Sequence, residues 1–351
     1  MQFDTRKLPC KLLAYVDSGR GWTPEQICAY PITNLCYAFG RIVNGAVSTA
    51  HFTMLDKLWR IKELRPDIRI QLSIGGWTAE GFSDAALTKE SRALFVRSAY
   101  ESLKDSPFEG LDIDWEYPGS DAAGIKARKE DRENYTALMT ELREMLDRLQ
   151  LANGKKPLLT MALGAGEKLL NDIEMQKLLP VMDFVNVMTY DLCTSSPKTR
   201  HHTCLKSPSY DPEQISLEKE TKLLLVAGIP REKIILGGSF YGRLWHKTRN
   251  EGTGLFQDSG QGVAAFEDFG IMLKNQLKDP AYKQYWDESA EAAYLFNGET
   301  FISYDNERSL KSKMRYVIEE KLGGFVFWEF SCDDSGTLIT ALSEALLAHS
   351  T

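Results

Sequence analysis

This sequence of 351 residues is poor in the cysteine and histidine patterns that form disulfide frameworks or bind metals. It has six cysteines and no C-x-x-C pair, and its only histidine cluster is His201–His202. Adjacent residues rarely direct both rings at one ion, so we expect no metal site, and nothing in the sequence indicates a cofactor. The cysteines are expected to be reduced core residues, with a loop disulfide between Cys193 and Cys204 as the alternative.

Long apolar runs and an excess of positive charge are also missing. No run approaches the ~20 apolar residues of a membrane span, and a net charge of −7 disfavours nucleic acid and anionic membranes as partners. Met1–Cys10 has two positive charges but no apolar segment behind them, unlike a signal peptide. We expect a monomer that is cytoplasmic as the chain stands, and secreted if the chain has been trimmed.

The sequence does contain a regular alternation of short apolar runs and helical patterns. Eight strands that alternate with helices favour a parallel sheet closed as a (β/α)8 TIM barrel, with a doubly wound sheet as the rival. The expected strands are Leu12–Tyr15, Asn34–Phe39, Ile68–Ser73, Leu111–Glu116, Leu158–Leu163, Phe184–Met188, Ile234–Gly238 and Gly324–Trp328. The expected helices are Phe52–Leu64, Lys89–Leu103, Glu130–Leu149, Glu174–Leu179, Leu217–Ala227 and Asn306–Glu320.

The last expected helix has the clearest ends. Asp305 precedes it as a predicted N-cap, and Gly323 follows it as a predicted C′ residue. Before it, the interval from Gly238 to Asn306 is longer than an ordinary loop of a barrel. We predict a small α+β insertion there, with a helix at Phe266–Leu277 and strands at Tyr294–Phe296 and Thr300–Tyr304. The predicted domains are a barrel of residues 1–242 and 305–351 and an insertion of residues 243–304.

The most informative segment carries alternating carboxylates. Side chains of a strand alternate between its faces, so Asp112, Asp114 and Glu116 share one face, opposite Leu111 and its apolar neighbours. Three ionised carboxylates inside a barrel would repel one another, so at least one proton should remain near neutral pH, ready for general acid catalysis. The alternatives are a solvated edge strand, which the apolar face contradicts, and a metal site, which lacks histidine partners.

These residues resemble the D-x-x-D-x-D-x-E signature of family-18 glycoside hydrolases, the chitinases and their relatives. Other segments are similar to that family in the same order along the chain. They are Ser73–Trp77, Met188–Asp191, Phe240–Arg243, Gly323–Trp328 and the end of the predicted insertion, Phe301–Asp305. The resemblance implies the barrel with a deep cleft, and it implies cleavage of chitin or N-acetylchitooligosaccharides.

The resemblance also implies residue roles in a retaining mechanism in which the substrate's acetamido group attacks its own sugar. Glu116 would protonate the glycosidic oxygen, and Asp114 would orient the acetamido nitrogen. Asp112 would share a proton with Asp114, Tyr190 would bind the acetamido oxygen, and Asp191 would bind the sugar.

Further residues are expected to bind substrate. The resemblance places Trp328 under the −1 sugar and Trp77 at +1, while Tyr15 and Ser73 assist the buried acids. Met188, Tyr241 and Arg243 complete the predicted set. Each has a plainer alternative: Tyr15 and Met188 could fill the barrel, Trp77 could pack a loop, and Arg243 could anchor the insertion.

One residue departs from the family signature, because Glu109 stands where the family has its first Asp. Glu109 is out of phase with the other acids, so we expect a changed supporting contact and retained activity. Three other functions stay open: an endo-β-N-acetylglucosaminidase, a peptidoglycan-cleaving enzyme, and a chitin-binding lectin without activity. Lectins of this kind typically lose the equivalent of Glu116, which is present here.

Overall fold

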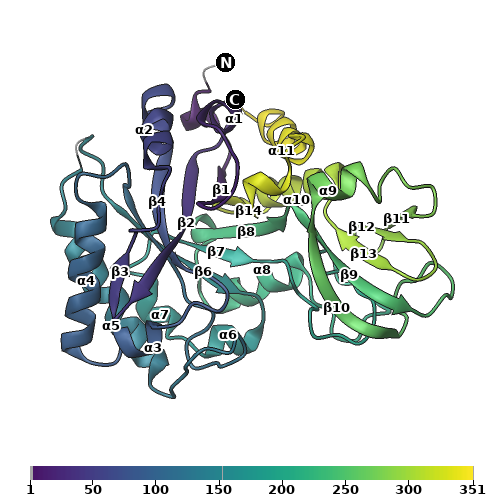
Figure 1. Ribbon diagram of the computed structural model, residues 1–351, viewed down its shortest axis with the longest axis horizontal. Coiled ribbons are helices and arrows are strands. Elements are labelled where there is room, and N and C mark those ends of the chain that lie inside the picture. The colour runs from purple at the N-terminus through teal and green to yellow at the C-terminus, as the bar shows by residue number, and fades with distance from the viewer. Residues whose placement is uncertain (1–2, 152, 351) are drawn as a thin grey trace.

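Eight parallel strands close into a barrel in the computed structural model, which describes residues 3–151 and 153–350 (Figure 1). Neighbouring strands follow the order β1-β2-β4-β5-β6-β7-β8-β14, and β14 pairs with β1 to complete the ring. The predicted (β/α)8 barrel is therefore confirmed, and the doubly wound sheet is wrong. The barrel strands are β1 (Lys11–Asp17), β2 (Asn34–Val43), β4 (Arg69–Gly75), β5 (Gly110–Asp114), β6 (Leu158–Gly164), β7 (Phe184–Met188), β8 (Ile234–Ser239) and β14 (Gly324–Trp328).

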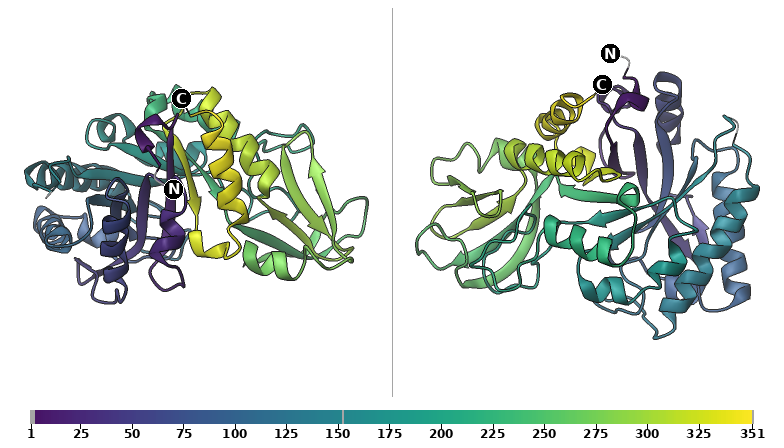
Figure 2. Two further views of the ribbon diagram at one scale, coloured as in Figure 1. Left: turned by 90° about the horizontal axis from the view of Figure 1, so that it is seen from above. Right: turned by 180° about the vertical axis from the view of Figure 1, so that it is seen from behind.

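Helices between these strands cover the outside of the barrel (Figure 2). The predicted bounds of α4 (Lys89–Leu103) are correct at both ends. The helix begins after Thr88, which accepts a hydrogen bond from the Ser91 amide as the N-cap. The other helices are α1 (Pro24–Cys28), α2 (Leu55–Leu64), α3 (Phe82–Ala85), α5 (Asp131–Arg148), α6 (Glu167–Asn171), α7 (Met175–Leu178), α8 (Leu217–Val226), α9 (Phe269–Lys274), α10 (Glu307–Glu319) and α11 (Thr337–Leu347). No helix in the described ranges combines the length and apolar character needed to span a bilayer.

Both predicted caps of α10 are wrong. Asn306 caps the helix by accepting from the Ser309 amide, while the Asp305 carboxylate is used by buried Lys313 instead. At the other end, the left-handed residue is Lys321, at φ +55°. Gly323 serves close packing, because a Cβ there would lie 2.2 Å from the Glu232 carbonyl oxygen.

A second sheet stands to one side of the barrel in all three views (Figure 1, Figure 2). It is antiparallel and has the order β10-β9-β13-β12-β11. Its strands are β9 (Tyr241–Thr248), β10 (Ser259–Asp268), β11 (Lys283–Asp287), β12 (Ala292–Phe296) and β13 (Phe301–Tyr304). The sequence predicted only β12 and β13, and it began the helix too early, because Phe266 belongs to β10.

The chain passes between the barrel and the second sheet through neighbouring strands. Strand β9 follows β8 almost directly, and β13 pairs with it so that Tyr304 lies opposite Gly242. The chain thus enters and leaves this sheet through neighbouring strands. On one face of this sheet, Trp245 and Phe301 belong to a small apolar cluster of their own. On the other face, Ile302 belongs to the main hydrophobic core. The exact division into a barrel and an insertion of residues 243–304 stays a prediction.

Two smaller features complete the fold. Strand β2 runs beyond its predicted end at Phe39 and forms a hairpin with β3 (Ala46–Ser48), which the sequence did not predict. All six cysteines lie within the described ranges and are free thiols, four of them buried. The reduced state is therefore confirmed, and the disulfide between Cys193 and Cys204 is wrong.

Candidate active site

Strand β5 positions the acids at the centre of the barrel. It ends at Asp114, earlier than predicted, but the alternation of faces continues to Glu116. Asp112 and Asp114 are buried in the lumen, whereas Trp115 points outward and stacks on Phe82 with ring centroids 5.2 Å apart. The apolar face of the strand therefore packs on the helical layer, and the acidic face is left to the interior.

Asp112 is held by four donors. Its Oδ2 accepts from Tyr15 Oη at 2.8 Å and Ser73 Oγ at 2.7 Å. Its Oδ1 accepts from Thr160 Oγ1 at 2.7 Å and Asn186 Nδ2 at 3.1 Å. Burial raises the pKa of Asp112, and these hydrogen bonds oppose the rise. Thr160 and Asn186 were missed, although each is a polar residue at an inward position of an otherwise apolar strand.

Asp114 differs from Asp112 because one of its carboxylate oxygens has no donor within the described part of the chain. Its Oδ1 is buried and has no hydrogen-bond partner among the described residues. Burial raises the pKa of Asp114 well above its usual range, and the charges of Glu116 and Asp112 add to the rise. Among the described contacts, Asp112 is bonded to its four donors rather than to Asp114. The geometry thus assigns a bound proton to Asp114 more readily than to Asp112.

Glu116 lies beyond the strand end and faces a cleft. Burial raises its pKa to about 7, and the negative charge of Asp191 contributes to the rise. A carboxyl with this pKa keeps its proton in part of the molecules near neutral pH. Such a group can donate a proton during a reaction and take one back afterwards.

The cleft above these acids has a volume of about 620 Å³. Every predicted site residue lines it except Asp112 and Ser73, which lie below it in the barrel. The predicted residues in the lining are Tyr15, Trp77, Asp114, Glu116, Met188, Tyr190, Asp191, Tyr241, Arg243 and Trp328. Lining residues that the sequence did not indicate include Phe39, Tyr117 and Phe266, which carry no motif and reach the cleft only through the fold.

Two tryptophans present flat surfaces to this cleft. Trp328 ends β14 and stacks on Phe39, with centroids 5.3 Å apart and an interplanar angle of 15°. Tyr15 supports it from the lumen at 5.5 Å. Trp77, in the loop after β4, is 57% exposed and meets Tyr117 edge to face. Most of this indole is uncovered, which is unlike a residue that packs a loop.

Tyr190 and Asp191 follow β7. Burial raises the pKa of Tyr190 well above its usual range, so the phenol remains a neutral donor. Asp191 accepts two hydrogen bonds from Arg243, at 2.6 and 2.5 Å. Burial alone would raise the pKa of Asp191, but the opposing contacts, of which the hydrogen bonds from Arg243 are the largest, outweigh it and lower the pKa. Arg243 therefore both anchors Asp191 and lines the cleft.

Glu109 lies at the other end of β5, away from the cleft. Its carboxylate accepts from Lys62 Nζ and Arg69 Nε, each at 2.8 Å, and from the side-chain amide of Asn153. This contact set joins the end of α2 to the start of β4. Glu109 is thus part of an ion-pair cluster at the bottom of the barrel, and the changed contact and retained activity stay predictions.

A second hollow, of about 850 Å³, lies on the outside of the molecule beside α10. Its lining is mostly charged, and Arg308 covers the Trp286 ring at 3.9 Å. Several of its charges pair with each other, as in Lys206 with Glu291. Its one aromatic ring is covered by Arg308, so the cleft above β5, which holds Glu116 and the uncovered Trp77, is the candidate active site. No cluster of three metal-ligating side chains occurs within residues 3–151 and 153–350.

Comparisons with known proteins agree with this geometry. The profile of glycosyl hydrolases family 18 matches residues 11–333. Chitinase A1 of Niallia circulans is 35% identical over 312 residues, which are 83% of this chain and 44% of that protein. The chain therefore spans less than half of that relative. Chitotriosidase-1 of Mus musculus is 28% identical, over 92% of this chain and 73% of that protein.

Among solved structures, a family-18 N-acetylglucosaminidase from Paenibacillus barengoltzii is 37% identical and superposes with a TM-score of 0.92, covering 96% of this chain and 100% of that one. The match to the family profile extends from the first barrel strand to beyond the last. The resemblance of the carboxylate strand is thus confirmed, and the chain belongs to glycosyl hydrolase family 18.

Proposed function

We propose that this protein is a chitinase that cleaves β-1,4-linked N-acetylglucosamine chains with retention of configuration. The observation that carries the proposal is Glu116, a cleft-lining carboxyl with a pKa near 7. A proton donor of this kind is what cleavage of a glycosidic bond requires. The names of the relatives, which are chitinases and an N-acetylglucosaminidase, support the same substrate class.

The attacking group is proposed to come from the substrate itself. The acids that line the cleft among the described residues are Asp114, Glu116 and Asp191. Asp114 projects from the same strand as Glu116, and Asp191 is held by Arg243, so neither suits attack from the opposite face of the sugar. Family 18 is known to use its substrate's acetamido group instead.

The steps follow from the positions of these side chains. Glu116 gives its proton to the glycosidic oxygen as the bond from that oxygen to C1 breaks, and the acetamido oxygen of the −1 sugar bonds to C1. Once Asp114 has given its proton to Asp112, its Oδ1, which lacks another partner among the described residues, accepts the acetamido N–H, and the carboxylate stabilises the positive charge that develops there. Tyr190 donates to the acetamido oxygen. Water then attacks C1 as the bond from C1 to the acetamido oxygen breaks, and Glu116 takes a proton from that water.

Other residues are proposed to bind the sugars. Trp328 would form the floor of the −1 subsite, because the apolar face of a sugar stacks well on indole. Trp77 would bind the +1 sugar. Tyr241, Arg243 and Phe266 would form one wall, which gives the second sheet its role in the cleft.

A second candidate function is release of single N-acetylglucosamine units from chain ends. It is favoured by the similarity to the Paenibacillus barengoltzii N-acetylglucosaminidase, which extends over all of that chain. Early products from N-acetylchitohexaose separate the two candidates, since single sugars indicate chain-end release and dimers or trimers indicate a chitinase. A glycan and a muropeptide assayed in parallel test for endo-β-N-acetylglucosaminidase activity and for cleavage of peptidoglycan.

The mechanism has its own test. Proton NMR of the first product should show the β-anomer, because two displacements at C1 retain configuration. A substrate with glucosamine in place of N-acetylglucosamine at −1 should not be cleaved, since it lacks the attacking oxygen. An initial α-anomer, or efficient cleavage after glucosamine, would show that the proposed mechanism is wrong.

A further inference from the structure

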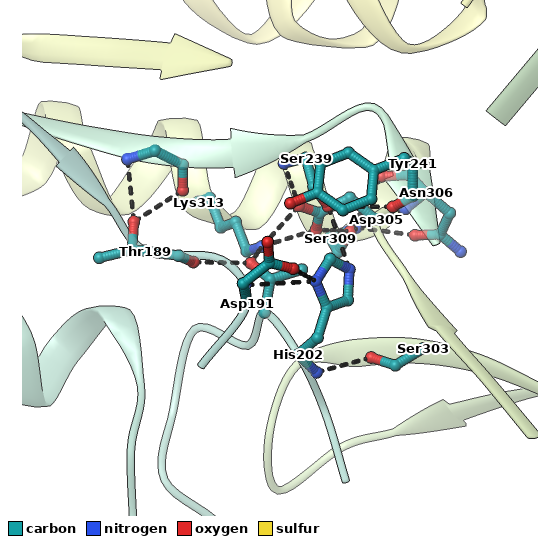
Figure 3. Close-up of polar contacts among 12 residues, drawn as sticks. Thr189, Asp191, His202, Ser239, Tyr241, Ser303, Asp305, Asn306, Ser309 and Lys313 are labelled. Atoms are coloured by element: carbon teal, nitrogen blue, oxygen red, sulfur yellow. Dashed lines mark hydrogen bonds and ion pairs between the residues drawn. The ribbon is translucent and has the colours of Figure 1, made fainter. Parts of the chain in front are cut away.

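His202 lies directly behind Asp191 and is fully buried (Figure 3). Its Nδ1 is 3.4 Å from the Asp191 backbone nitrogen, which donates to it, and also 3.4 Å from Asp191 Oδ1, with which it forms no hydrogen bond among the described contacts. Its Nε2 is 3.2 Å from Ser239 Oγ, at the end of β8. No motif of the sequence singled this histidine out, and none of the steps proposed above uses it.

The surrounding hydrogen bonds assign the tautomer of this ring. The Ser239 hydroxyl donates to the Tyr241 carbonyl oxygen at 3.2 Å, so its oxygen is free to accept from the histidine. Nε2 therefore carries the proton and Nδ1 offers its lone pair to the Asp191 N–H. Burial lowers the pKa of His202, which keeps the ring in this neutral form.

The charges around the ring are already balanced. Asp191 is paired with Arg243, and Asp305 is paired with Lys313 at 2.6 Å with both side chains fully buried. These four are the charged groups that face His202 from β7, β9, β13 and α10. A protonated imidazole would add a buried charge beside a carboxylate, that of Asp191, which Arg243 already neutralises, and this is costly. The ring thus acts by hydrogen bonds and not by charge.

Asp191 needs such support because its backbone is strained. It has φ +58°, a left-handed conformation that non-glycine residues rarely adopt, and Arg243 holds its carboxylate from one side. His202 is itself fixed, since its amide donates to Ser303 Oγ at 2.9 Å and its ring lies 5.4 Å from that of Tyr241. The support therefore extends from the second sheet to the barrel (Figure 3).

We propose that His202 is a positioning residue that fixes Asp191, and through it the neighbouring Tyr190, by accepting the Asp191 backbone N–H at Nδ1. This inference rests on the proposed function, because the group it positions is assigned there to sugar binding. It adds a requirement of its own. The site depends on the Nδ1 atom of His202 as a hydrogen-bond acceptor, and not on the size or the charge of the side chain.

Two amide substitutions separate the two ring nitrogens. In His202→Asn the amide oxygen can occupy the place of Nδ1, while in His202→Gln the amide nitrogen can occupy the place of Nε2. Both variants lose one buried contact, so both should unfold at a lower temperature. Only His202→Gln leaves the Asp191 N–H without an acceptor. We expect kcat on N-acetylchitohexaose to fall by ~10-fold to 10²-fold in His202→Gln and by less than about threefold in His202→Asn.

A second measurement does not depend on activity. Hydrogen–deuterium exchange of the peptide that contains Asp191 should be faster in His202→Gln than in wild type and nearly unchanged in His202→Asn. Equal kcat per folded molecule in the two variants, or equal exchange at Asp191, would overturn the proposal. If wild type cleaves none of the substrates, the proposed function fails, and the exchange experiment still decides whether His202 holds Asp191.

Discussion

The two ends of strand β5 carry the same residue type under opposite conditions. At the bottom of the barrel, Glu109 is surrounded by Lys62, Arg69 and the Asn153 amide. At the top, Glu116 is half-buried beside other acids, and its pKa rises to about 7. Cations and an amide donor surround the first carboxylate, while burial and like charge favour a proton on the second. The comparison shows that surroundings decide whether a glutamate is structural or able to transfer protons.

The largest expected effect comes from removing the Glu116 proton at the top of strand β5. Glu116→Gln cannot protonate the leaving oxygen, so turnover of N-acetylchitohexaose should fall by ~10²-fold to 10⁴-fold or more. Oligosaccharide binding, measured by calorimetry, should persist because the cleft walls are unchanged.

Glu109→Gln is the matched control for this experiment. It makes the same chemical change at the other end of the strand and should retain most of the turnover. Near-normal hydrolysis by Glu116→Gln, or an equal loss in the two variants, would break the comparison.

The second effect is on the free energy of unfolding. The Gln substitution should lower it at Glu109, whereas at Glu116 it should raise it relative to wild type as pH increases. Glu109→Gln removes a charged acceptor from Lys62 and Arg69, which should lower the free energy of unfolding by roughly 1–3 kcal/mol. Urea unfolding followed by circular dichroism measures this. An unchanged unfolding free energy would show that the cluster at the bottom of the barrel contributes nothing.

Glu116→Gln should behave differently as pH changes. The native state keeps the Glu116 proton up to a pKa of about 7, whereas the usual value is 4.5. The free energy of unfolding of wild type therefore falls as pH rises between these values. The Gln variant lacks this pH-dependent loss, because its side chain does not titrate. The stability of Glu116→Gln relative to wild type should thus be higher at pH 8 than at pH 4. The opposite trend would indicate that Glu116 has a cationic partner.

The smallest effect is a shift in the pH dependence of activity. Wild-type kcat/KM should decline as pH rises through about 7, because Glu116 loses the proton it must donate. Asp191→Asn removes a negative charge that raises this pKa, so the residual activity should decline at a lower pH, by less than about one pH unit. A basic limb that stays in place would show that burial alone sets the pKa of Glu116.

The barrel could be predicted because each of its strands is a short buried run, and the carboxylates of β5 mark one face of one strand. Strands β9, β10 and β11 could not, since β9 and β10 mix glycine and polar residues with apolar ones and β11 is half exposed. Their pairing within the second sheet supplies what the local sequence lacks.

The site divides in the same way. Asp112 and Glu116 lie on a strand and are visible as a spacing in the sequence. His202 lies in a loop, and its contact with Asp191 depends on how that loop returns past β8. Asn186 is an intermediate case, because its inward position on β7 could have been noticed without the fold.

The pairing of Gly242 with Tyr304 has a consequence for how such a protein can change during evolution. The chain leaves the barrel and returns to it through neighbouring antiparallel strands, which lie ~5 Å apart in any sheet. A gene segment that encodes everything between them can be gained, lost or exchanged, and a tight reverse turn would join what remains. We expect the barrel to keep its closure in either case, because none of its eight strands lies between Gly242 and Tyr304. On this expectation, exchange of the second sheet would give one catalytic scaffold clefts of different depth.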